Sequence, residues 1–135
     1  MKTPQPMGDY TSIQLESGFF FTAGITPRRD GLLQHRGRVG TEVNGVDVER
    51  AAHLATNNLI NVVEDAVGNG AKPLSLTVYI ACAPSFTDHS RIADSCSGVL
   101  KERYGSVPAR AAVGVCSLPG GAPIELAMTG SYQPG

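Results

Sequence analysis

The fold is decided by the stretch VPARAAVGVCSLPGGAPIELAMTGSY, residues 107–132. Its two apolar runs, separated by the Pro/Gly-rich segment LPGGAP, predict two strands joined by a turn. The first strand carries one charge, Arg110, near its beginning. The return strand, residues 124–129, carries the carboxylate of Glu125 and no other charge. A functional interpretation therefore has to explain a single cation and a single carboxylate on two otherwise apolar strands.

Arg110 shares one face of its strand with Ala112, Gly114 and Cys116, because alternate residues of a strand point the same way. These small neighbours leave room beside the guanidinium, whose planar fork can bind both oxygens of a carboxylate. The spacing alone also allows a structural ion pair with an acid of a neighbouring subunit. Glu125 could act as a general base, or it could be a solvated residue of its strand.

Apolar residues recur at helical spacing in two segments of the chain. The first helix is predicted at residues 48–67, with Asp47 as its cap and Gly68 at its end. The second helix is predicted at about residues 88–104, and Gly105 ends it. The sequence TDHS at its start contains an Asp-His pair, which we interpret as part of a helix cap.

The other strands are predicted from alternation and from short apolar runs. Residues 11–24 predict two short strands around a Ser-Gly turn, with residues 19–22 as a buried apolar run. Residues 74–83 predict the next strand. The segment between them and the first helix, residues 25–45, is predicted to be a loop, and its unusual length indicates a function or a subunit contact.

The predicted order is β-β-α-β-α-β-β, which is typical of an α+β fold with one mixed sheet and two helices on one face. With 135 residues, we expect one domain spanning residues 1–135. The second face of such a sheet would be bare unless another copy of the chain covered it. We therefore expect a homo-oligomer.

Composition and charge exclude several classes of function. The net charge is -1 and no basic run is present, so we expect no nucleic-acid partner. No apolar run is long enough to span a membrane, and the N-terminal MKTPQPMGDY has no signal-like stretch. Three cysteines without C-x-x-C spacing favour reduced thiols in the cytoplasm. We expect no metal and no cofactor.

Two further side chains are candidates with open alternatives. Tyr10 precedes the first strand, where its phenol could contact a ligand or its ring could simply pack. Cys116 has no identifiable cation nearby, so it is interpreted first as a small core residue and second as a nucleophile.

Three segments of the sequence resemble the Rid (YjgF) family, which is often labelled endoribonuclease L-PSP. GDYTSIQLESGFFFTAGITP, residues 8–27, resembles a segment in which a tyrosine precedes a strand and a later strand ends in a T-S-G-Q-like turn. Residues 54–96 are similar to the helix, strand and second helix of the family core. Residues 107–130 are similar to its P-A-R-S, L-P and I-E-I-E-A signature. The longer middle segment is most similar to a divergent branch of the family.

The resemblance implies a chorismate mutase-like fold and a homotrimer. In such a trimer the sheets line a central barrel, and a ligand cleft lies between neighbouring subunits. It also implies hydrolysis of reactive imines and enamines. There an arginine clamps the substrate carboxylate, and a glutamate positions the attacking water together with backbone groups.

Carried over residue by residue, the resemblance matches Arg110 to the clamping arginine and Glu125 to the first glutamate of the signature. The candidate catalytic residues are Glu125, Tyr10 and Cys116. The candidate ligand-binding residues are Arg110, Tyr10, Ala23, Gly24, Phe86, Ala112 and Ala127.

Three of these positions depart from the family pattern. Ala127 replaces the second glutamate of the signature. The resemblance implies that this glutamate positions the water in deaminating members. Ala23 replaces a serine, and Ala112 replaces a cysteine. The expected function is binding of a small carboxylate-bearing imine, enamine or related unstable metabolite by a divergent deaminase or pathway-specific enzyme that lacks the usual water-activating glutamate. The alternative is a non-catalytic binder or regulator of 2-oxo or amino acids, and RNA cleavage is a weaker third class.

Overall fold

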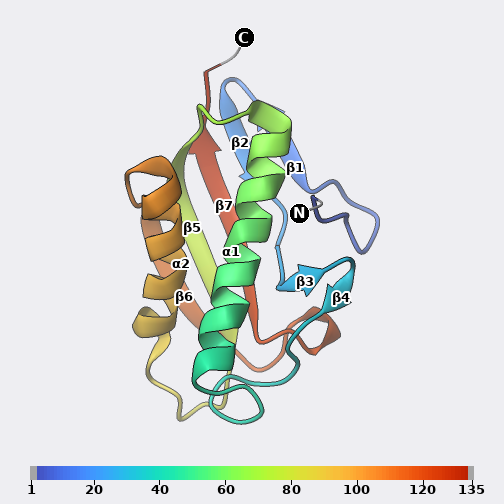
Figure 1. Cartoon of the computed structure of the whole chain (residues 1–135), viewed down its shortest axis with the longest axis vertical. Helices are drawn as coiled ribbons and strands as arrows, with labels where there is room; N and C mark the ends of the chain where they lie inside the picture. Colours follow the sequence, from blue (N-terminus) through green and yellow to red (C-terminus); the bar gives the residue numbers. More distant parts are fainter. Residues whose placement is uncertain (1–2, 134–135) are drawn as a thin grey trace.

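The computed structural model describes residues 3–133 and contains one five-stranded mixed sheet with two helices on the same face (Figure 1). The sheet has the order β1-β2-β7-β5-β6, and only β5 and β6 are parallel. The elements are β1 (Ile13–Glu16), β2 (Phe19–Thr22), β3 (Arg28–Arg29), β4 (Leu32–Leu33), α1 (Val46–Val67), β5 (Lys72–Ala81), α2 (His89–Tyr104), β6 (Ala109–Val115), the 3-10 turn η1 (Pro119–Gly121) and β7 (Ile124–Ser131). The predicted sheet and helices are confirmed.

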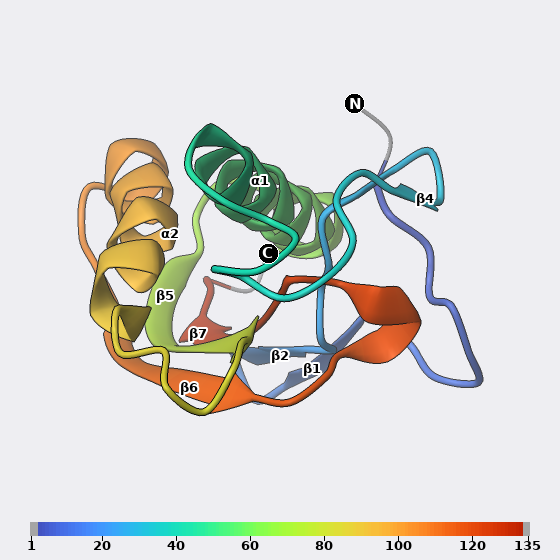
Figure 2. The ribbon, with the colours of Figure 1, turned by 90° about the horizontal axis from the view of Figure 1, so that it is seen from below.

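Both helices lie on what we call the covered face of the sheet (Figure 2). Residues of β5 and β7 alternate in burial, and those that point toward the helices are fully or almost fully buried. They form the core with the apolar stripes of α1 and α2. The central members are Phe20, Leu59, Val63, Leu76, Val78, Ile80, Cys96, Leu100, Leu126 and Met128.

The opposite face, which we call the uncovered face, has no helix or strand packed on it within residues 3–133 (Figure 2). It carries Phe19 and Phe21, which are 44% and 47% exposed, while Phe20 between them is buried. The prediction of a continuously buried run at residues 19–22 is therefore wrong. Alternate side chains point to opposite faces, and only one face of this sheet is covered by its own chain.

The helix ends differ slightly from those predicted. Helix α1 begins after Gly45, whose φ of 54° suits a residue without a side chain, so Asp47 lies in the first turn rather than at the cap. At the start of α2, Asp88 occupies the cap position but makes no side-chain capping bond. The predicted C-terminal ends of both helices are confirmed. The backbone N–H groups of Gly68 and Gly105 donate to the carbonyl oxygens of Glu64 and Lys101 and so complete the last turn of each helix.

The segment predicted as a plain loop, residues 25–45, contains the small hairpin of β3 and β4. Its turn is Asp30-Gly31, with φ values of 52° and 79°. Two residues with positive φ form the turn type that favours Asp-Gly, so the sequence did contain a hairpin signal. Near the end of the same segment, Val39 donates a backbone bond to Ala81 and pairs with Cys82, which fastens the segment to the end of β5.

Among residues 3–133, none of the helices combines the length and the apolar character needed to cross a lipid bilayer.

Candidate functional site

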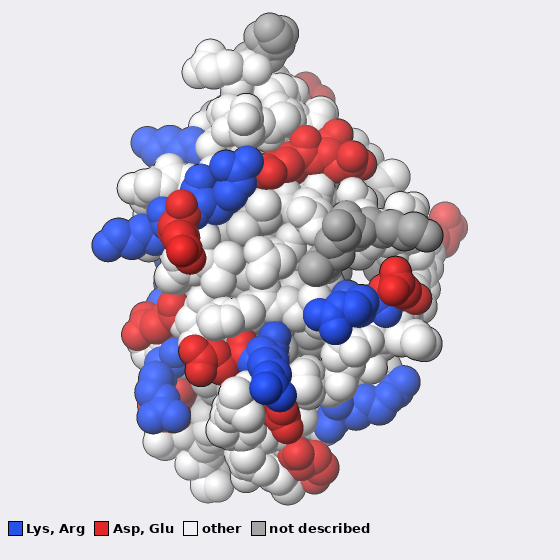
Figure 3. Space-filling model, in the orientation of Figure 1, with Lys and Arg blue, Asp and Glu red and all other residues white. Residues whose placement is uncertain are grey.

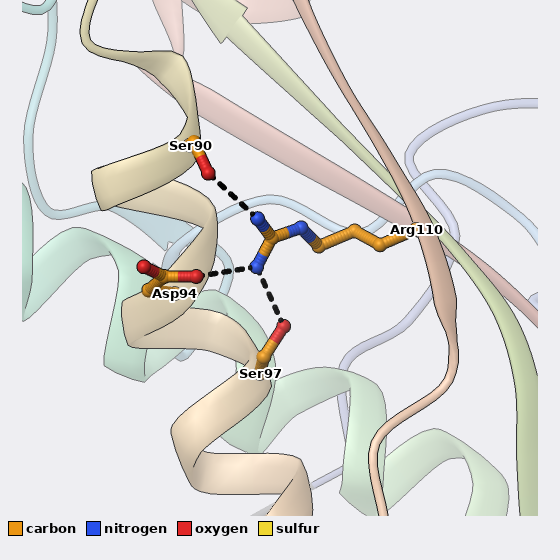
Figure 4. A network of polar contacts seen from close by, with 4 residues as sticks. All are labelled: Ser90, Asp94, Ser97 and Arg110. Carbon is orange, nitrogen blue, oxygen red and sulfur yellow. Dashed lines mark hydrogen bonds and ion pairs between the residues drawn. The ribbon is translucent and has the colours of Figure 1, made fainter.

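Arg110 lies on β6, an edge strand, and its side chain points to the covered face (Figure 4). Its Nη1 donates to Asp94 Oδ1 at 2.8 Å and to Ser97 Oγ at 3.0 Å. Its Nη2 donates to Ser90 Oγ at 3.0 Å. The guanidinium is thus held by one helix of its own chain, and the expectation of open space beside it is wrong for the single subunit.

The partners of Arg110 form a polar stripe on α2. Ser90, Asp94 and Ser97 are spaced four and three residues apart, so they lie on one side of the helix, next to its apolar stripe. The Arg110 side chain is 21% exposed and that of Asp94 is 70% exposed. The ion pair is therefore half-open to solvent, and the helix fixes the direction of the guanidinium. Sequence reasoning missed this stripe, although its spacing is visible in the sequence.

Glu125 lies on β7 and points to the uncovered face, opposite Tyr79 of β5. Its carboxyl packs directly against Gly24, where a Cβ atom would collide with it. The pairing of Ile25 with Leu126, through backbone bonds of 2.7 and 2.8 Å, brings Gly24 to this position. Burial removes water from the carboxylate and raises the pKa of Glu125.

One side of the molecule carries three of the candidate residues, Tyr10, Ala23 and Gly24. Tyr10 and Gly24 line one small cavity, together with Ser12 and Arg28. Ala23 donates its N–H to the carbonyl of Ser12 at 2.8 Å, which holds the turn that carries Gly24. The Tyr10 side chain is exposed, and its hydroxyl accepts a bond from the Met7 N–H at 3.2 Å. The structure thus brings Tyr10, Gly24 and Glu125 into one region.

The other candidates lie apart from that region. Cys116 is exposed, so its interpretation as a core residue is wrong: β6 ends at Val115, and Cys116 belongs to the bend that follows. It lines a separate cavity with Arg38 and Glu42. Phe86 packs edge-on against the ring of His89, with 5.2 Å between ring centres, and lines a third cavity.

A thiol and an imidazole that sequence reasoning did not select lie close together. Cys82 Sγ and His89 Nε2 are 3.8 Å apart beneath Gly114. A Cβ atom at position 114 would lie 2.5 Å from His89 Nε2, so the glycine makes room for the ring. By contrast, burial raises the pKa of Cys96 to about 11, which leaves that thiol unreactive. In residues 3–133 no three His, Cys, Asp or Glu side chains gather as they would around a metal ion.

The two charged candidates point to opposite faces of the sheet. Arg110 pairs with Leu76, whose side chain is buried under the helices, and Ala112 follows on the same face. Glu125 and Ala127 follow each other on the uncovered face. Within one chain, β5 separates the two strands that carry the arginine and the glutamate.

Comparisons with known proteins agree on the class of fold. Together with the element order, the structural matches identify an α+β chorismate mutase-like fold. The family model described as endoribonuclease L-PSP matches residues 1–131. The chain therefore belongs to the endoribonuclease L-PSP family, which is the family that the sequence resembles.

Individual relatives are distant. Protein TCP17 of Trypanosoma cruzi is 26% identical over 127 residues, which are 90% of this chain and 79% of that protein. A candidate endoribonuclease of Shewanella oneidensis superposes with a TM-score of 0.90 at 20% identity, over 98% of this chain and 91% of the other. TdcF of Escherichia coli, solved with bound serine, gives a TM-score of 0.72 at 21% identity, over 97% and 94%. The likenesses to these two solved structures establish the fold alone.

Proposed function

We propose that this protein is a homotrimer that binds a small carboxylate-bearing imine or enamine in a cleft between subunits and hydrolyses its C=N bond. The observation that carries the proposal is the placement of Arg110 and Glu125 on opposite faces of the sheet. A ligand of a few ångströms can touch both groups only where two subunits meet. The exposed phenylalanines of the uncovered face give the subunits a reason to associate.

In the proposed reaction Arg110 of one subunit holds the ligand carboxylate through charge-assisted hydrogen bonds. Glu125 of the neighbour removes a proton from water as the water oxygen bonds to the C=N carbon. The same carboxyl returns this proton to the nitrogen, which gives a carbinolamine. It then carries the hydroxyl proton to the nitrogen as the C–N bond breaks, so that ammonia leaves and the carbonyl of a 2-oxo acid forms. The raised pKa of Glu125 suits this exchange, because a group that both accepts and donates protons works best near the working pH.

Ala127 does not remove this chemistry, because Glu125 supplies the half-buried carboxyl beside Gly24. The residue at 127 lies one step further along the same face, roughly 6–7 Å away. We assign the handling of water to Glu125, and an apolar surface beside the ligand to Ala127. Bound serine in the structural neighbour TdcF supports a small amino-acid-like ligand.

RNA cleavage, which the family description names, receives no support from the surface charge. On the helix-bearing face, Lys and Arg are interspersed with Asp and Glu instead of gathering in a basic band (Figure 3). Binding a phosphate backbone depends on clustered positive charge.

Complementation between subunits tests the proposal. Arg110→Ala and Glu125→Gln should each abolish ammonia release from imines that an amino-acid oxidase generates in the assay. When the two variants are co-expressed and assemble at random, about one quarter of the interfaces should combine an intact arginine with an intact glutamate. Mixed trimers should then regain about a quarter of the wild-type rate.

A mixture as inactive as its parents would place both groups in one subunit and refute the shared cleft. A wild-type protein without activity would refute the hydrolase. Calorimetry with 2-oxo and amino acids would then test the alternative, a non-catalytic binder.

A further inference from the structure

We propose that the cavity between helix α1 and the β3–β4 hairpin is a second ligand site, which binds a small molecule through a phosphate group. The cavity has a volume of about 470 Å³. Its polar lining residues all carry N–H donors: they are Arg29, Gln34, His35, Arg50, His53 and Asn57. Within residues 3–133 no acidic side chain lines it. Neither the family resemblance nor the proposed function gives these residues a role.

The two walls of the cavity come from different parts of the chain. Arg50, His53 and Asn57 are three and four residues apart on α1, so they form a stripe along one side of the helix. The facing wall belongs to residues 25–45, the segment whose unusual length predicted a function or a subunit contact. Binding of a ligand gives that length a purpose.

A buried amide holds the two walls together. Asn58 of α1 is 1% exposed, and its Nδ2 donates to the carbonyl oxygens of Thr26 and Arg28 at 3.2 and 2.7 Å. These bonds fix the first strand of the hairpin beside the helix (Figure 1). Arg29 follows directly after the fixed carbonyl of Arg28, so its backbone is in place before a ligand arrives. A preorganised wall lowers the cost of ordering the site.

The charges around the cavity favour an anion. Arg29 is exposed on the hairpin, and Arg50 faces it from the helix. The nearest acid to Arg50 is Asp47, at 3.7 Å, which is too far for a hydrogen bond and leaves the guanidinium donors free. Glu49 lies 4.0 Å from His53 Nε2. Both acids are half-exposed or more and lie outside the lining, so each pair is loose and contributes little.

The donor set suits a phosphate better than a carboxylate. A phosphate monoester carries close to two negative charges at neutral pH and presents three acceptor oxygens. Two guanidinium groups on opposite walls can each donate to different oxygens, whereas a planar carboxylate is satisfied by one arginine. Each imidazole keeps at least one N–H donor whatever its charge. The volume leaves room for the organic part of the ligand.

The site is separate from the proposed cleft. It lies beside α1, on the helix-bearing side of the sheet, so assembly through the uncovered face leaves it open (Figure 2). Two arginines form a site for one phosphate group. They do not form the band of positive charge that an RNA strand needs.

The three histidines of the chain give a direct readout of where a ligand binds. His35 and His53 line the cavity, whereas His89 lies beside Cys82 beneath Gly114. Phenyl phosphate, added at neutral pH, should shift the NMR signals of the His35 and His53 rings and leave those of His89 in place. Benzoate has the same ring and a carboxylate, and it should cause at most a tenth of the occupancy at equal concentration.

Arg50→Gln and Arg29→Gln should each weaken the binding of phenyl phosphate by about tenfold, because each loses charge-assisted hydrogen bonds. Arg91→Gln is the matched control. Arg91 is also an exposed helix residue that pairs with an acid three positions earlier, Asp88 at 3.3 Å, but it lies on α2. This control removes the same charge and should bind phenyl phosphate as the wild type does. Thermal melting should be unchanged in all three variants, since their side chains are exposed.

Four outcomes would overturn the site. Phenyl phosphate might shift neither His35 nor His53, or benzoate might shift them equally. Binding might be unaffected in both Arg29→Gln and Arg50→Gln, or it might weaken equally in Arg91→Gln. None of these outcomes bears on imine hydrolysis, which depends on Arg110 and Glu125.

Discussion

Arg110 and Glu125 lie on strands β6 and β7, which flank β5 in one sheet, yet their surroundings within the chain are opposite in kind. Arg110 points under helix α2, where three side chains of its own subunit hold it. Glu125 points to the uncovered face, and its shift in pKa comes from burial, with no charged partner contributing. The arginine half of the site is complete in a single chain. In the glutamate half, the Glu125 carboxyl is partly removed from water, and no charged partner contributes to its shift in pKa.

The difference indicates that the glutamate half of the site, rather than the arginine half, depends on assembly. A half-buried carboxyl whose pKa is raised by burial, with no charged group lowering it, favours its protonated form, and that state is useful when a proton must be moved. A paired arginine is preorganised, and a ligand meets it in a fixed direction. The comparison therefore predicts that changes near Glu125 affect catalysis most, whereas changes around Arg110 affect which ligand binds.

The largest expected effect is that of Glu125→Gln. Loss of a general acid–base group typically lowers a rate by about 10²–10⁴-fold, and we expect that loss in imine hydrolysis with ligand affinity nearly kept. Glu16→Gln is the control, because Glu16 lies on the same uncovered face at the far edge of the sheet. Ammonia release under saturating imine would measure the effect. Equal rates in the two variants would remove Glu125 from the mechanism.

A smaller effect is expected from Gly24→Ala. The new methyl group would collide with the Glu125 carboxyl, and displacing a reacting group by about 1 Å can cost on the order of 100-fold in rate. Gly24 does not need a positive φ, so the substitution introduces no backbone strain there. Activity should therefore fall far more than the melting temperature. A variant as active as the wild type would show that the packing of glycine on glutamate has no role.

The uncovered face should control assembly. Light scattering on the wild type should give about three times the 14.1 kDa subunit mass. Phe21→Asp places a charge on that face and should shift the mass toward one subunit, because a buried unpaired charge is costly. Leu32→Asp, on the exposed hairpin of β3 and β4, is the control and should leave the mass unchanged. A wild-type monomer would contradict the shared cleft.

The smallest effect concerns stability and pH. The pKa of Glu125 is raised in the folded state from its ordinary value of 4.5, so folding favours the protonated carboxyl. Its contribution to stability is full at acid pH and is lost as the pH rises through the folded pKa. Glutamine does not ionise, so Glu125→Gln does not lose this stability as the pH rises. The free energy of unfolding of Glu125→Gln relative to the wild type should therefore rise from pH 4 to pH 7. Urea unfolding at both pH values would measure this, and a difference of opposite sign would contradict the burial.

Much of the architecture was predictable from the sequence, because it depends on local periodicity. The apolar stripes of α1 and α2, their terminal glycines, and the two strands around LPGGAP all follow from spacing along the chain. The hairpin at Asp30-Gly31 was predictable as well, from its turn residues, but the length of the surrounding segment obscured it.

The sequence by itself determined the order of the two helices and the five strands of the main sheet, the family, and the choice of Arg110 and Glu125 as the charged residues of interest. Tertiary structure alone decided that Asp94 and two serines hold the arginine, that Gly24 packs on the glutamate, and that Phe19 and Phe21 are exposed. These facts depend on contacts between residues distant in the chain and on which face of the sheet the helices cover. Alternation along a strand specifies that two faces exist, and packing specifies what each of them meets.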